Sequence, residues 1–236
     1  ADQIAKLLYG EKTVELKLPL SIPSLEVKPF NGLPNPEQAI SAALLNPIKR
    51  SPLSELARGK KTACVVISDF TRPVPNKIIL PPLLHTLEQN GIEAQDITIL
   101  IATGMHRPNL GKELENLVGR DIMDRYPIEN HYCRKSETYR KIDEIEGAPI
   151  EINTTYLDAD LKILTGLIEP HFYAGYSGGR KAILPGISSF ETMKFMHSYE
   201  MIDHPSVTNC LLEGNPFHEY GIRVAELARP HFILNV

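Results

Sequence analysis

The sequence contains no tryptophan and only three cysteines in 236 residues. Cys64, Cys133 and Cys210 lie far apart and form no CxxC pair, which argues against a disulfide framework and a structural zinc site. No apolar run approaches the roughly 18 residues of a membrane span, and the first residues lack the apolar core of a signal peptide. We therefore expect a cytoplasmic protein that does not enter a membrane.

Excess positive charge is also missing, because 25 Lys and Arg residues face 29 Asp and Glu residues and give a net charge of −4. Without a basic tract, nucleic acid is not an expected partner. The hydrophobic fraction of 42% and the charged fraction of 23% are those of a globular protein, which excludes disordered, collagen-like and coiled-coil classes.

Continuous apolar segments predict the centre of the fold. Segments 62–68, 96–102 and 161–168 are predicted as strands, and the first two have the unbroken apolar character of parallel strands buried on both faces. Helical segments, about 76–90 and 110–118, follow the first two strands. This alternation predicts an α/β fold with a mostly parallel, Rossmann-like sheet and helices on both faces.

Other segments fill in the order of elements. Residues 12–18 alternate like a half-buried strand, and the five prolines in 19–36 predict a surface connection. The remaining expected elements are a helix that opens at Pro36, a strand at 149–156, helices at about 188–199 and 216–228, and a last strand in 231–236.

Three polar clusters each come directly after one of the central strands. They are DFTRPVP (69–75), TGMHRP (103–108) and EPHFYAGYSGGRK (169–181). Because ligands of parallel sheets sit beyond the carboxyl ends of the strands, we expect the three loops to converge on one site.

The glycine-rich segment 175–182 resembles a phosphate loop but departs from its pattern at two positions. Arg180 stands where the second glycine should be, and Ala182 replaces the hydroxyl that binds magnesium, so we exclude ATP or GTP hydrolysis. Exposed backbone N–H groups beside Arg180 and Lys181 still suit an anionic group. The alternative is a flexible surface turn with two solvated cations.

Four residues of the post-strand loops are candidates for chemistry. Asp69 and Arg72 could bind hydroxyl and phosphate groups, or could form a local ion pair in a turn. A single histidine at a strand end is more often structural, but His106 and His171 occupy equivalent ends. Two acid/base groups on opposite faces of a substrate are what inversion of a stereocentre needs.

Taken together, four segments resemble the nickel-dependent lactate racemase family. They are DFTRPVP (69–75), TGMHRP (103–108), EPHFYAGYSGGRKAILPG (169–186) and MKFMHS (193–198). The resemblance extends over essentially the whole chain, and the central stretch with its lysine is the most specific part. It implies that residues 1–236 form the family's N-terminal cofactor-binding and catalytic domain, with the family's C-terminal domain absent from this chain.

The same resemblance implies a nickel-pincer nucleotide as cofactor. This pyridinium-3,5-bisthiocarboxylic acid mononucleotide would be joined covalently to Lys181, and its nickel would be bound by His197. Soft sulfur ligands with one imidazole suit nickel and would explain why the sequence has no ligand cluster such as HExxH. The residues assigned to cofactor binding are Asp69, Phe70, Thr71, Arg72, Ser177, Gly178, Gly179 and Lys181.

The activity implied by the resemblance is racemisation or epimerisation of a small 2-hydroxy acid. His106 and His171 would exchange protons with the substrate hydroxyl while hydride moves to and from the cofactor, and cofactor-synthesis proteins would be partners. Two alternatives remain open. One is a nickel-cofactor-binding protein without turnover, and the other is a metal-dependent phosphoester hydrolase, for which only Asp69 is well placed.

Overall fold

The structure, a computed structural model, describes residues 3–10, 12–19, 22–23, 25 and 27–236. Parts of the predicted proline-rich connection, at 20–21, 24 and 26, lie outside these residues. The chain divides into two compact units, Ala1–Pro34 and Asn35–Val236, which are described separately.

The first unit contains a β-hairpin. Strand β1 (Gln3–Tyr9) pairs antiparallel with β2 (Lys12–Leu18). The predicted strand at 12–18 is confirmed, but its predicted half-burial is wrong, because Val14 is 48% exposed and Leu16 is 46% exposed. Two strands alone offer no second layer against which one face could be buried.

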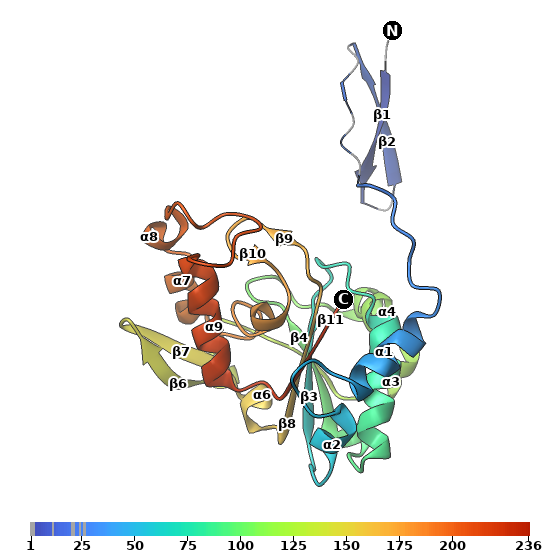
Figure 1. The fold of residues 1–236 in the computed structure, drawn as a ribbon, viewed down its shortest axis with the longest axis vertical. Helices are drawn as coiled ribbons and strands as arrows, with labels where there is room; N and C mark the ends of the chain where they lie inside the picture. The colour runs from blue at the N-terminus through green and yellow to red at the C-terminus, as the bar shows by residue number, and fades with distance from the viewer. Residues whose placement is uncertain (1–2, 11, 20–21, 24, 26) are drawn as a thin grey trace. The chain divides into compact units, whose positions relative to one another are not determined.

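The second unit is built on a parallel sheet of five strands in the order β11, β8, β3, β4, β5. Figure 1 shows β11, β8, β3 and β4 at the centre of the unit. Their bounds are Phe232–Asn235 (β11), Leu161–Gly166 (β8), Ala63–Ser68 (β3), Ile97–Ala102 (β4) and Ile128–Asn130 (β5). The predicted parallel α/β fold is confirmed.

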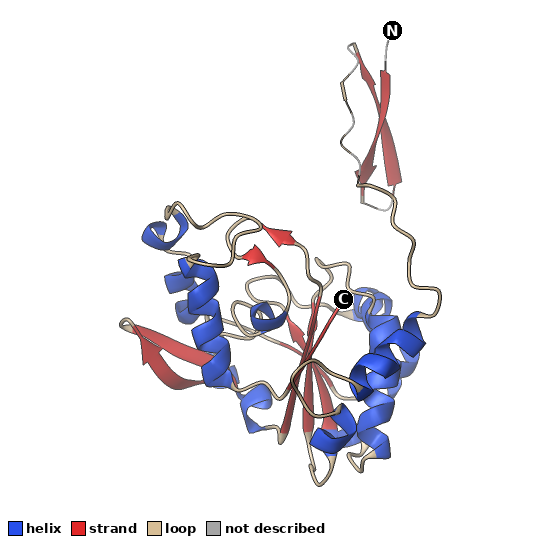
Figure 2. Cartoon of the chain, viewed as in Figure 1, coloured by secondary structure: helices blue, strands red, loops and turns tan. Residues whose placement is uncertain are grey.

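Helices cover both faces of this sheet, as predicted (Figure 2). Successive residues of β3 alternate between the two cores, since Val65 and Ile67 pack in one and Cys64 and Val66 in the other. The first face is covered by α1 (Pro36–Leu45), α2 (Leu53–Ala57), α3 (Asn76–Gln89) and α4 (Gly111–Val118). The second is covered by α6 (Thr154–Asp158), α7 (Phe190–Met196) and α9 (Pro216–Ala228).

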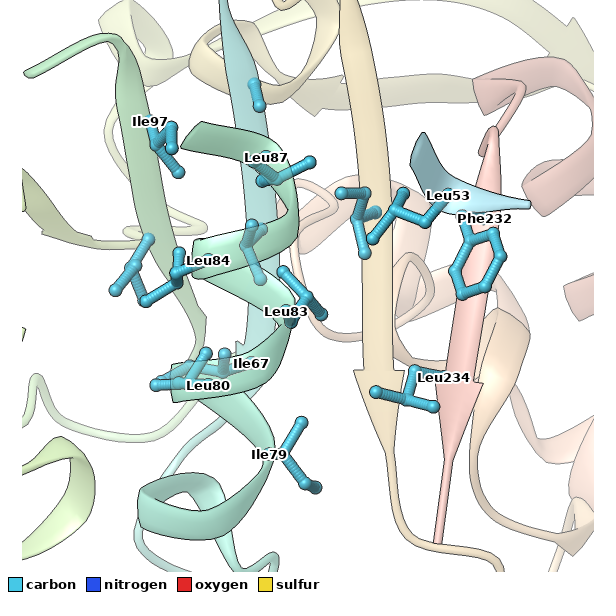
Figure 3. Close-up of a cluster of buried hydrophobic side chains, with 14 of the residues drawn as sticks. Leu53, Ile67, Ile79, Leu80, Leu83, Leu84, Leu87, Ile97, Phe232 and Leu234 are labelled. Carbon is cyan, nitrogen blue, oxygen red and sulfur yellow. The ribbon is translucent and has the colours of Figure 1, made fainter. Parts of the chain in front are cut away.

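Helix α3 shows how the sequence anchors this layer. Leu80, Leu83, Leu84 and Leu87 recur at helical spacing, are buried, and are directed at the strands (Figure 3). Burial of each such side chain contributes roughly 1.5–3 kcal/mol. The layer therefore gives β3 and β4 a rigid base beneath the loops that follow them.

Two predicted elements differ in the structure. The strand expected at 149–156 is β7 (Ala148–Asn153), which pairs antiparallel with β6 (Tyr139–Ile145) outside the parallel sheet. The residues after it turn into α6, because the Asn153 side chain accepts a hydrogen bond from the Tyr156 N–H. The helix expected at about 188–199 ends at Met196, and α8 (Tyr199–Ile202) begins separately after the cap residue Ser198.

Short elements complete the unit. They are α5 (Arg120–Arg125), the 3-10 turns η1 (Ala94–Asp96), η2 (Ser136–Thr138) and η3 (Gly179–Ala182), and the two-residue strands β9 (Pro170–His171) and β10 (Gly175–Tyr176). Among the described residues, none of the helices combines the length and apolarity needed to cross a membrane.

Candidate active site

A cavity of about 230 Å³ lies where the loops after β3, β4 and β8 meet. The structure thus brings the three predicted loops together at the carboxyl edge of the sheet. The predicted residues that line the cavity are Asp69, Thr71, Arg72, His106, His171, Ser177, Gly178, Lys181 and His197. Phe70 and Gly179 belong to the same loops but are not among the lining residues.

Asp69 and His106 form a direct pair. Asp69 Oδ2 lies 2.7 Å from His106 Nδ1, and Asp69 Oδ1 accepts a hydrogen bond of 2.6 Å from the Thr71 hydroxyl. The carboxyl group of Asp69 is nearly inaccessible, with 4% of the side chain exposed. A carboxylate at Nδ1 holds the ring proton there and leaves the Nε2 lone pair of His106 available as a base.

Arg72 reaches in the opposite direction from Asp69. Its Nη1 donates to Glu169 Oε1 at 2.8 Å, so the two residues do not form the local ion pair that the sequence left open. The contact ties the loop after β3 to the loop that carries His171. Sequence reasoning did not single out Glu169, although its position directly before Pro170 and His171 in a post-strand cluster was a usable signal.

His171 has different neighbours from His106. Its Nδ1 accepts hydrogen bonds from the backbone N–H groups of Tyr173 and Ala174, each at 3.2 Å. The proton of the neutral ring is therefore on Nε2. Burial, followed by the positive charges of Lys181 and Arg72, lowers the pKa of His171 to about 4. The imidazole is neutral at pH 7.

Lys181 presents its amine to the cavity from η3. Burial, followed by the charges of Arg180 and Arg72, lowers its pKa to about 7. In the described part of the chain no carboxylate forms an ion pair with this amine. A large fraction of Lys181 is therefore the neutral, nucleophilic amine near pH 7.

The glycine-rich loop is held in place by internal contacts. Gly178 and Gly179 have φ of 81° and 49°, and a Cβ on Gly178 would lie 3.1 Å from Asn235 Oδ1. Gly179 N donates to the same oxygen at 3.1 Å, and the Ser177 hydroxyl donates to the Leu167 carbonyl at 2.6 Å. Such a loop is a fixed part of the site.

Arg180 is equally fixed. Its Nη2 donates to the carbonyl groups of Ala174 and Tyr176 at 2.8 and 3.2 Å, and burial lowers its pKa to about 10. Arg180 and Lys181 are thus not the solvated cations of a surface turn.

His197 stands at the C-terminal end of α7 with one ring nitrogen committed. Its Nδ1 donates to the Met193 carbonyl at 3.0 Å, which leaves Nε2 with a free lone pair in the cavity. Histidines that bind metals usually donate their second nitrogen in this way. Burial lowers the pKa of His197 and so favours the neutral form that a metal requires. In the described residues no group of three or more His, Cys, Asp or Glu side chains could hold a metal ion.

Comparison with known families assigns the chain. The lactate racemase N-terminal domain matches residues 9–209, which include every candidate site residue. The chain belongs to this family. Two curated lactate racemases are similar to it over 201 residues, with 42% identity for the protein of Thermoanaerobacterium thermosaccharolyticum and 41% for that of Lactiplantibacillus plantarum. These matches cover 85% of this chain and 47% of each relative, so the chain spans about half the length of these lactate racemases.

Two solved structures superpose on this chain, and one of them is a lactate racemase. The lactate racemase apoprotein of T. thermosaccharolyticum superposes with a TM-score of 0.85 at 37% identity, over 99% of this chain and 55% of that one. A protein from Thermotoga maritima superposes with a TM-score of 0.69 at 25% identity, over 85% of this chain and 51% of that one.

Proposed function

We propose that this lactate racemase family domain contributes to the racemisation or epimerisation of a small 2-hydroxy acid, with nickel in a pincer nucleotide as cofactor. The observation that carries the proposal is the pairing of His106 and His171 on one cavity with Lys181 and His197. His106 and His171, the two candidates for proton transfer, come from loops on either side of β3. Lys181 supplies an amine, and His197 supplies an imidazole lone pair. The cytoplasm as location and cofactor-synthesis proteins as partners belong to the same proposal.

The residues of the cavity fit this cofactor. Lys181 would form the covalent link through its amine, and His197 would bind nickel through Nε2, the nitrogen that no protein group occupies. When bound, the group supplies a pyridinium ring that accepts the hydride of the substrate and returns it. The fit rests on the chemistry of these two side chains, because a neutral amine and a neutral imidazole with a fixed tautomer are both ready to bond.

The proton steps fall to the two histidines. We assign His106 Nε2 to removal of the hydroxyl proton, with the charge that develops on the ring stabilised by the Asp69 carboxylate at 2.7 Å. We assign His171 to the other face of the substrate. There the ring takes up a proton before it donates one to the new hydroxyl group, and its low pKa makes that protonated form a strong acid. In the reverse direction the two histidines exchange these tasks.

The nucleotide contacts are the remaining part of the proposal. Arg72 would bind the phosphate and Asp69 the sugar hydroxyls, with Phe70, Thr71, Ser177, Gly178 and Gly179 beside them. Asp69 already has His106 and Thr71 as partners, and Arg72 already has Glu169. Both contacts to the nucleotide would thus be shared with, or exchanged for, contacts inside the protein.

The proposal is tested with the full-length protein, produced together with cofactor-synthesis proteins. We expect bound nickel, an adduct at Lys181 in peptide mapping, and conversion of (S)-lactate or another 2-hydroxy acid to its mirror image. Lys181→Ala should lose the adduct, whereas Lys194→Ala, which changes an exposed lysine, should keep it. An unmodified Lys181 in an active, nickel-containing sample contradicts the covalent assignment, and nickel and adduct without turnover would favour the binding protein.

A further inference from the structure

Four residues beside the Asp69–His106 pair form a closed ring of contacts. The Phe70 N–H donates to Asn109 Oδ1 at 3.3 Å, and Asn109 Nδ2 donates to Glu113 Oε1 at 2.7 Å. Glu113 accepts two hydrogen bonds of 2.7 Å from Arg107, whose guanidinium carbon lies 4.5 Å from the centroid of the Phe70 ring. The chain of contacts therefore begins and ends at Phe70.

Asn109 is the buried member of this ring. It is fully inaccessible to solvent, and its backbone is fixed as well, since its N–H donates to Asn130 Oδ1 at 2.8 Å and its carbonyl accepts from Asn130 Nδ2 at 3.1 Å. Its side chain oxygen and nitrogen each have a partner in a different segment. A buried amide that is bonded through both its oxygen and its nitrogen favours one geometry, because a displacement leaves these polar atoms unpaired.

The ring joins the two loops whose ends form the proton-transfer pair. Phe70 directly follows Asp69, and Asn109 is three residues beyond His106. Two ties therefore connect the loops side by side, one between Asp69 and His106 and one between the Phe70 N–H and Asn109. The second tie is partly buried and ends on the inaccessible side chain of Asn109, whereas the side chain of His106 is 55% exposed.

We propose that Asn109 is a positioning residue that keeps His106 aligned with Asp69 through this ring. The proposal rests on the proposed function for its catalytic consequence, but its structural part concerns only the unloaded protein. An exposed histidine with a single carboxylate contact has other rotamers available. The Asn109 tie removes this freedom by fixing the separation of the two backbones, so that the proton of the neutral ring stays on Nδ1 and the basic nitrogen keeps one direction.

The first test measures the tautomer of His106 by nitrogen NMR at pH 8 in the protein without cofactor. The wild type should show the proton on Nδ1. Asn109→Leu, which removes both side-chain contacts at similar volume, should give a mixture of the two tautomers. In the loaded full-length enzyme the same variant should lower kcat about tenfold, the scale of one lost hydrogen bond, while KM changes less than twofold.

A reciprocal exchange tests the ring itself. Asn109→Asp keeps an acceptor for the Phe70 N–H but places a carboxylate against Glu113, so it should disturb the tautomer of His106. Adding Glu113→Gln restores one donor and one acceptor at this contact, in reversed order; Arg107 Nη1 loses its acceptor, while Arg107 Nη2 keeps the remaining oxygen. The double variant should therefore recover the Nδ1 tautomer and most of kcat, which loss of stability alone would not predict.

Asn215→Leu is the matched control, because Asn215 is also fully buried and bonded through both side-chain atoms. It should lower stability without changing the tautomer of His106. A wild-type tautomer in Asn109→Leu, or a double variant no better than Asn109→Asp, would overturn the proposal. If instead the tautomer responds as expected but the loaded wild type does not turn over, the positioning role stands and the proposed function fails.

Discussion

His106 and His171 occupy corresponding places after strands on either side of β3, yet their surroundings differ. His106 has a buried carboxylate at Nδ1, whereas Nδ1 of His171 accepts two backbone N–H groups and has cations nearby. The first arrangement leaves Nε2 of His106 as the acceptor nitrogen of the ring, whereas in the second, burial and the nearby cations lower the pKa of His171. The difference teaches that two histidines at equivalent positions need not be equivalent acid/base groups.

The strand order explains how one loop serves both histidines. Because β3 lies between β8 and β4, the loop after β3 lies between the loops of His171 and His106. Asp69 bonds to one neighbouring loop and Arg72 to the other, through Glu169. Asp69 and Arg72, three positions apart in the sequence, thus place a negative charge toward one side of the cavity and a positive charge toward the other.

The largest expected effect comes from removing either histidine in the loaded full-length protein. His106→Ala and His171→Ala should each lower turnover about 100-fold or more in both directions, the usual contribution of a positioned proton-transfer group. Nickel content, measured by elemental analysis, should hardly change. His197→Ala is the contrasting variant and should lose nickel. If His171→Ala lost the metal and His197→Ala kept it, the assigned roles would be reversed.

A smaller loss of kcat is expected when the Asp69 carboxylate beside His106 is neutralised. Asp69→Asn removes the charge that faces His106 Nδ1 and keeps the shape of the side chain. A charge-assisted hydrogen bond contributes roughly 1.5–3 kcal/mol, so kcat should fall about 10- to 150-fold. A kcat within twofold of the wild type would show that His106 does not depend on Asp69.

His131 is a third histidine that makes the comparison sharper, because it is buried outside the cavity. Its Nε2 donates to the Ser188 carbonyl at 2.8 Å, its Nδ1 accepts from Asn153 at 3.2 Å, and burial lowers its pKa to about 4. The folded state thus binds fewer protons than the unfolded state. Its stabilising contribution is complete above the unfolded pKa near 6.5 and is lost as pH falls toward 4.

The free energy of unfolding should therefore fall between pH 7 and pH 5, by about 2 kcal/mol from His131 alone. Urea unfolding at the two pH values measures this change. His131→Gln should be less stable at pH 7 but should show a flatter pH dependence. A slope equal to that of the wild type would mean that other groups cause the acid sensitivity.

The smallest effect concerns the charges around His171. Arg72→Gln and Lys181→Met each remove a cation that lowers the pKa of His171, so each should raise it from about 4, and Lys181→Met should raise it more. Burial remains in both variants and should keep the pKa below the usual 6.5. NMR titration of the unloaded protein measures these shifts, and a wild-type His171 that titrates near 6.5 contradicts the described surroundings.

The sequence was informative where one strong physical constraint acts. Strands buried on both faces must be continuously apolar, so 62–68 and 96–102 could be predicted, and the polar clusters after them followed. The strand predicted at 149–156 is present as β7, although it ends at Asn153. Its antiparallel partner β6 was not predicted, because its residues are too polar to stand out in the sequence.

The candidate site, like the fold, could be predicted only in part from the sequence. The convergence of the three loops followed from the topology, which is confirmed. The hydrogen-bond partners of individual side chains could not be predicted from the sequence. Asp69, for example, is equally compatible in the sequence with a contact to Arg72, to His106 or to a ligand, and the structure pairs it with His106. Glu169 and Asn109 act through contacts to residues 97 and 39 positions away, and nothing local marks such pairs.

The most direct test of the account is a single-turnover experiment with each enantiomer, using loaded full-length protein in excess over substrate. Trapped 2-keto acid reports oxidation of the substrate and needs only the histidine that removes the hydroxyl proton. His106→Ala should form keto acid from one enantiomer and His171→Ala from the other, while the wild type forms it from both. Loss of the same enantiomer in both variants would contradict the assignment of the two histidines to opposite faces.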